Sequence, residues 1–152
     1  MTHLVQEYFE HSADRFPEKI AVTCGDDEIS YKDLEDFSNG LAHHLIELGV
    51  TRGQLIPFFM DKNIAAFKSQ LGILKADCAY VPLDPKAPGP RVASILERCE
   101  ARFVLVDNDS IGTMKAFLAE AGANVTLVNV DEVEVKDTSR RTYANISVDM
   151  VY

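Results

Sequence analysis

The chain has 152 residues, of which 47% are hydrophobic and 26% are charged, and these values suit one soluble globular domain. Its formal net charge of −9 argues against nucleic acid or an anionic membrane as the main partner, because both favour a basic surface. No apolar run approaches the roughly 20 residues of a membrane-spanning helix, and the N-terminus lacks the basic start and apolar core of a signal peptide.

The cysteine pattern indicates a reducing environment. Cys24, Cys78 and Cys99 are odd in number and widely separated in the sequence, which is typical of free thiols rather than of a disulfide framework. Together with the lack of a signal peptide, this pattern predicts a cytoplasmic location.

The first third of the chain predicts a helix, a small hairpin and a second helix. Apolar residues follow a helical spacing up to Pro17, which ends the first helix. Residues 20–24 and 28–30 alternate as two short strands around the turn GDDE. Ser30 and Asp33 have the spacing of a capping box, so the second helix is expected to begin there.

From Gly49, which is placed to end the second helix, strands and helices alternate. The predicted strands are residues 55–60, 79–81, 103–106 and 125–130. The helices between them are marked by apolar residues at three- and four-residue intervals: Ile64, Phe67, Leu71 and Leu74; Val92, Ile95, Leu96 and Cys99; Ile111, Met114, Leu118 and Ala121. Because these strands are apolar on both faces, we predict a doubly wound α/β fold, with a mainly parallel sheet, helices on both faces and a small N-terminal hairpin.

A proline-rich segment follows the strand at residues 79–81. Pro82, Pro85 and Pro88 recur every three residues, and each biases the residue before it towards extended backbone. The segment therefore predicts a rigid exit from the strand and a helix that starts beside Pro88. Asp84 lies between the first two prolines, and we expect its carboxylate to brace the turn through local backbone bonds rather than to act in catalysis.

The common motifs of phosphate binding and nucleophilic catalysis do not occur. The sequence contains neither G-x-x-x-x-G-K-[ST] nor G-x-G-x-x-G, and it has no G-x-S-x-G serine elbow. The histidines lack the spacing of metal ligands, because His43 and His44 are adjacent, and His3 and His11 have no Cys or Asp at ligand spacing. We expect all four at the surface or near helix ends.

Two carboxylates follow the strand at residues 103–106, where α/β folds place ligands. Asp107 and Asp109 lack the second acidic cluster that a phosphoacceptor site needs. Ser110 is expected to cap the next helix, which Gly122 ends, and we expect the two carboxylates to help start that helix alongside Ser110. The residues themselves therefore assign no catalytic, cofactor-binding or metal-binding position.

The C-terminal segment, residues 131–152, is poorly specified. Residues 131–142 are charged and have no clear period, which predicts a surface connection, and residues 143–152 begin to resemble another strand. We predict a single α/β subdomain over residues 1–152 that is a piece of something longer.

Three stretches are familiar together and in this order: LVQEYFEHSADRFPEKIAV (4–22), ISYKDLEDFSNGLAHHL (29–45) and GILKADCAYVPLDPKAPGPRVASIL (72–96). The second and third resemble the first two core motifs of amino-acid adenylation domains in nonribosomal peptide synthetases, which belong to the adenylate-forming, AMP-binding superfamily. The first is typical of the way such domains start. Asp77 and Cys78 depart from the motif, because the family usually has glycine or alanine there.

This resemblance implies the N-terminal subdomain of an ATP-dependent ligase. The complete parent would activate an amino acid, or another carboxylic acid, as an acyl-adenylate and pass it to a carrier-protein thiol. ATP and Mg²⁺ are implied for the parent and not for this chain, because the family's phosphate loop, acid pocket and catalytic lysine would follow Tyr152. The chain alone is expected to be inactive and to need the remainder of the adenylation domain, or a complementary subunit, as its partner.

A second hypothesis is a stand-alone, non-enzymatic interaction module built on the same subdomain. Such a module would expose apolar surface and self-associate, or bind a complementary subdomain. The apparent start of a strand at the C-terminus favours the fragment. Acyl- and aryl-CoA ligases share the scaffold and stay open as parents, and the activated acid cannot be read from this sequence.

Overall fold

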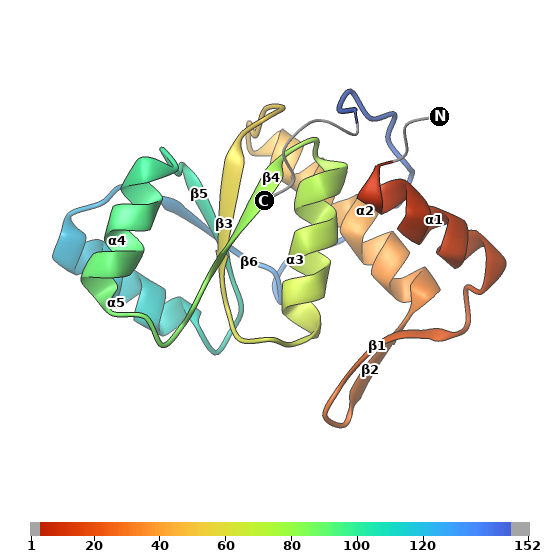
Figure 1. Cartoon of the computed structure of the whole chain (residues 1–152), viewed down its shortest axis with the longest axis horizontal. Helices are drawn as coiled ribbons and strands as arrows, with labels where there is room; N and C mark the ends of the chain where they lie inside the picture. Colours follow the sequence, from red (N-terminus) through yellow and green to blue (C-terminus); the bar gives the residue numbers. More distant parts are fainter. Residues whose placement is uncertain (1–3, 147–152) are drawn as a thin grey trace.

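The structure is a computed structural model that describes residues 4–146, and the elements follow the predicted order (Figure 1). The helices are α1 (Val5–Arg15), α2 (Tyr31–Glu47), α3 (Ile64–Lys75), α4 (Gly89–Arg98) and α5 (Ile111–Ala121). The strands are β1 (Ile20–Cys24), β2 (Asp27–Ser30), β3 (Leu55–Phe59), β4 (Ala79–Leu83), β5 (Phe103–Val106) and β6 (Thr126–Asn129).

The described part of the chain forms one parallel sheet and a separate hairpin. The sheet has the strand order β4-β3-β5-β6, and all three pairs of neighbours are parallel. The chain leaves β3 for β4 on one side, crosses to β5 on the other side and continues to β6. Strands β1 and β2 pair antiparallel. The prediction of a doubly wound α/β fold with an N-terminal hairpin is confirmed.

Helices cover both faces of the sheet, as Figure 1 shows. On one face, Leu41 of α2 and Ile73 of α3 are buried with Ile56 of β3. On the other face, Phe59 of β3 is buried with residues of α4 and α5, among them Met114. Neighbouring residues of a strand point to opposite faces, so β3 contributes to both cores and is apolar throughout.

The predicted helix ends are present. Ser30 Oγ accepts a hydrogen bond from the Asp33 backbone N–H at 3.0 Å and donates one to the Asp33 carboxylate at 2.8 Å. Gly49 and Gly122 follow α2 and α5 with φ angles of 93° and 61°. This left-handed backbone is the reason that glycine ends these helices.

Strand β4 is longer than predicted, because it includes Pro82 and Leu83. Proline cannot donate a hydrogen bond to a neighbouring strand, but in the described sheet β4 pairs only with β3 and leaves its other edge open. The turn after β4 is braced as predicted, because the N–H of Lys86 donates to Asp84 Oδ1 at 2.9 Å. The next helix starts at Gly89, directly after Pro88.

Residues 135–146, here called the strap, follow β6 after a short connection and contact α1, α2 and the end of α3. The strap has no helix or strand, so the strand predicted to begin at residue 143 is absent from residues 143–146; the rest of that prediction lies outside the described residues. The strap runs close to α2 at Gly40, where an added Cβ would lie 2.5 Å from a Val135 methyl group. It is a surface segment, as predicted, but it is held to the helices at many points.

Candidate functional site

The centre of the sheet is where open α/β folds place their ligands. The helices that follow the neighbouring strands β3 and β5 pack on opposite faces, so the carboxyl ends of these two strands form the topological switch point of the sheet. Asn63 follows β3 and Asp107 follows β5, which places both residues at this switch point.

These side chains bind each other. Asn63 Nδ2 donates to Asp107 Oδ2 at 2.8 Å, and Asp107 Oδ1 accepts from the Ser110 N–H at 2.9 Å. Burial alone would raise the pKa of Asp107, but its hydrogen bonds from Ser110 and Asn63 hold that pKa below the usual value. The charged carboxylate thus ties β5 to the start of α5 and to α3.

The predicted helix-starting role is confirmed for Asp107. The Ser110 hydroxyl accepts from the Asp107 backbone N–H at 3.1 Å and makes no capping bond to α5, so Asp107 supplies the local bonds that we expected from Ser110. Asp109 is exposed. The polar groups at the switch point therefore bind one another.

A cleft of about 760 Å³ lies beside the exit of β4. Its lining includes the buried apolar residues Phe58, Met60 and Leu83. The charged residues of its lining are two lysines and two aspartates, so their charges cancel: Lys62, Lys86, Asp61 and Asp84. A triphosphate needs an excess of donors and cations, which this lining lacks.

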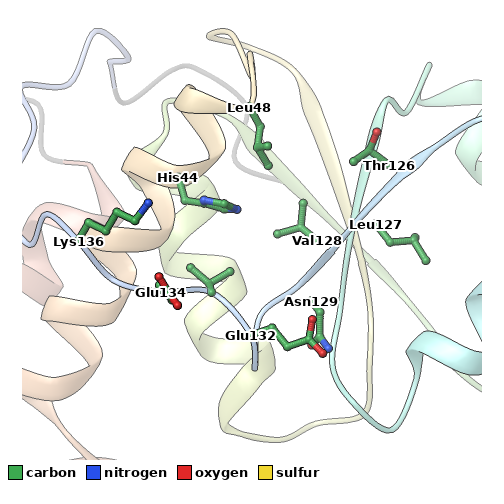
Figure 2. A pocket seen from close by; sticks show the side chains of 10 residues that line it. His44, Leu48, Thr126, Leu127, Val128, Asn129, Glu132, Glu134 and Lys136 are labelled. Atoms are coloured by element: carbon green, nitrogen blue, oxygen red, sulfur yellow. The ribbon is translucent and has the colours of Figure 1, made fainter.

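Another groove, of about 340 Å³, follows the edge of β6. Figure 2 shows His44 on α2 and Leu48 directly after α2 at one side of it, Val128 on β6 at the other, and Glu132 and Glu134 below. Within residues 4–146, no group of three or more His, Cys, Asp or Glu is placed to hold a metal ion.

The contacts of His43 and the state of the cysteines indicate structural roles. His43 Nε2 lies 3.0 Å from the Ser139 carbonyl oxygen and 3.6 Å from an Asp137 carboxylate oxygen, so it anchors the strap to α2. His3 lies outside the described residues. All three cysteines are free, as predicted. Burial raises the pKa of Cys78 to about 11, so its thiol is protonated at neutral pH.

A buried charge cluster was missed by sequence reasoning. The Lys75 side chain of α3 is 1% exposed, and its Nζ lies 2.6 Å from Glu35 Oε2 and 2.7 Å from Asn39 Oδ1 on α2. Arg140 of the strap donates from Nε to Glu35 Oε1 at 2.7 Å. A carboxylate from α2 therefore lies between one cation from α3 and another from the strap.

The pKa shifts follow from this arrangement. Burial alone would raise the pKa of Glu35, but hydrogen bonds from Lys75 and Arg140 hold it below the usual value. Burial lowers the pKa of Lys75, and the attraction of Glu35 opposes this shift. Arg140 also makes two bonds to the Asp14 carboxylate, at 2.9 and 3.0 Å. The cluster joins α1, α2, α3 and the strap.

Comparison with known proteins shows the family of the chain. Residues 9–149 match the family described as AMP-binding enzyme. The chain belongs to this family. Malpinin synthetase of Mortierella alpina is 32% identical over 142 residues, 93% of this chain. AM-toxin synthetase AMT1 of Alternaria alternata is 41% identical over 105 residues, and tyrocidine synthase 2 of Brevibacillus parabrevis is 34% identical over 104. The chain spans only 2 to 3% of the length of these three relatives.

Solved structures agree with the resemblance to adenylation domains. The nonribosomal peptide synthetase FmoA3 in its AMPPNP-bound form has a TM-score of 0.90 and 29% identity, and the match covers 99% of this chain and 16% of FmoA3. VinN, at 19% identity and a TM-score of 0.77, shares the fold. The predicted likeness to the N-terminal subdomain of a peptide synthetase adenylation domain is confirmed. No described helix is both long and apolar enough to cross a membrane.

Proposed function

We propose that the chain is the N-terminal part of an ATP-dependent adenylation domain. The complete domain activates an amino acid, or another carboxylic acid, as an acyl-adenylate for transfer to a carrier-protein thiol. The observation that carries this proposal is the match to FmoA3, which covers 99% of this chain but only 16% of the synthetase. A second FmoA3 structure, at a TM-score of 0.87, holds α-methyl-L-serine-AMP, an amino acid joined to AMP.

In this proposal, the chain supplies scaffold rather than catalytic groups. Asn63 and Asp107 at the switch point bind each other, and the cleft beside β4 has a balanced charge. The groups that stabilise the developing charge of the reaction then belong to the remainder of the domain, or to a complementary subunit, which is the proposed partner. ATP and Mg²⁺ bind the complete domain, and we place the protein in the cytoplasm.

The proposal predicts that the purified 152-residue chain has no adenylation activity. ATP–pyrophosphate exchange, assayed with Mg²⁺ and pools of amino acids and aryl acids, should stay at the rate of a blank without protein. A complete adenylation domain such as that of FmoA3, assayed with its amino acid in the same buffer, controls for the assay. Exchange that requires both this chain and one acid would contradict a scaffold role.

The stand-alone interaction module stays a second candidate because α1 exposes apolar side chains. Val5 and Tyr8, one helical turn apart, are 57% and 64% exposed. Exposed apolar surface of this kind favours association. The two candidates differ in the expected size of the natural polypeptide.

A further inference from the structure

Asp77 has an unusual backbone for its residue type. It follows Ala76, the C-cap of α3, and its φ angle is 58°. Glycine is the ordinary residue at such a left-handed position, because any Cβ is crowded there. Asp77 is also buried, at 3% exposed. A buried, charged residue in a conformation that suits glycine needs a compensating interaction.

The strap supplies that interaction. The backbone N–H of Ala144 donates to both Asp77 carboxylate oxygens, at 3.1 and 3.2 Å, and the N–H of Asn145 donates to Oδ1 at 3.0 Å. Arg141 lies 3.9 Å from Oδ2 and donates to the Lys75 carbonyl at 2.6 Å. The carboxylate thus holds two consecutive backbone N–H groups of a segment about 67 positions away in the sequence.

A second anchor lies earlier in the strap. Arg140 is bound to Glu35 and Asp14, as described above, and the Tyr143 hydroxyl donates to the Glu10 carboxylate. These bonds, like those of Asp77, are polar and involve charged groups. Most of residues 135–142 remains exposed, so apolar burial contributes little there. A segment held in this way can open without unfolding the core.

We propose that residues 138–146 detach from the helix layer and bind to it again as one unit while the sheet stays folded. Asp77 and Glu35 are the two carboxylates that hold this segment, and we call the arrangement the polar latch. Asp77 occupies a left-handed backbone position, and its carboxylate is the group that binds the segment. The proposal of this latch does not depend on the proposed adenylation function.

Hydrogen exchange measured by mass spectrometry on the full 152-residue chain tests the latch. In the parent, peptides from residues 138–146 should exchange faster than peptides from β3 and β5. Asp77→Gly keeps the left-handed backbone and removes the carboxylate. It should speed exchange in residues 138–146 by at least about tenfold, because charge-assisted hydrogen bonds are lost, and leave β3 and β5 unchanged.

The chain offers a matched control in Glu100, which also has a positive φ angle, 49°, and follows α4 on the other face of the sheet. Glu100→Gly makes the same backbone change and should leave exchange in the strap unchanged. Asp77→Asn keeps one acceptor oxygen and should lie between Asp77→Gly and the parent. Unchanged exchange of the strap in Asp77→Gly would overturn the proposal. Equal acceleration of the strap, β3 and β5 would overturn it too, because the segment would then not open separately.

Discussion

Glu35→Ala should lower the free energy of unfolding by about 3–5 kcal/mol, because it removes one partner of a buried ion pair. Lys75 is 1% exposed and would keep only the Asn39 side-chain oxygen as an acceptor. Urea unfolding followed by circular dichroism measures the change. The double variant Glu35→Leu with Lys75→Met should recover much of the loss, since apolar side chains of similar volume often replace a buried pair at little cost.

The same helix provides the control for this prediction. Asp36 is ion-paired with Lys32 on the exposed face of α2, and Asp36→Ala should leave the urea midpoint within error of the parent. Equal midpoints for Glu35→Ala and Asp36→Ala would refute the buried cluster.

The loss caused by Glu35→Ala should also depend on pH. The folded state holds the pKa of Glu35 below its usual value, so the stabilisation is present above the unfolded value of about 4.3 and is lost as the pH falls through the folded pKa. The difference between parent and variant should therefore shrink below about pH 4.

Phe59→Ala should cost about 3–5 kcal/mol, because it leaves a cavity where β3 meets the α4–α5 layer. The Phe59 side chain is fully buried, and its ring packs edge-on against Phe117 of α5, with 5.9 Å between the centroids. Phe67→Ala is the matched control: this phenylalanine of α3 is 40% exposed, so its loss should cost under about 1 kcal/mol. Similar losses for both variants would contradict a sheet packed on both faces.

The parts of the fold that the sequence predicts well depend on local signals. Apolar strands that alternate with helices predicted the parallel sheet, and Ser30, Gly49 and Gly122 marked helix ends by their own chemistry. The roles of Asp84 and Asp107 were predictable because their bonds reach residues only two or three positions away. The length of β4 was not, since Pro82 breaks a strand unless that strand lies at an edge.

The charge cluster could not be predicted in the same way. Glu35 and Arg140 are 105 positions apart, and Glu35 and Lys75 are 40 apart, so no local spacing connects them. Each residue alone looks like an ordinary surface charge. One signal of the cluster is present in the sequence: Lys75 lies near the end of the apolar helix α3. Asp77 follows it, at a position where the family that the sequence resembles usually has glycine or alanine. The bond between Asn63 and Asp107 similarly depends on the placement of β3 beside β5.

The size of the natural polypeptide tests the central claim most directly. An antibody raised against the 152-residue chain would be used on denatured extracts of the source cells, and tryptic peptides of the recovered band would confirm that it contains this sequence. The account predicts a band far above 16.9 kDa, with further peptides from the remainder of an adenylation domain. A single band near 17 kDa would contradict it and favour the stand-alone interaction module.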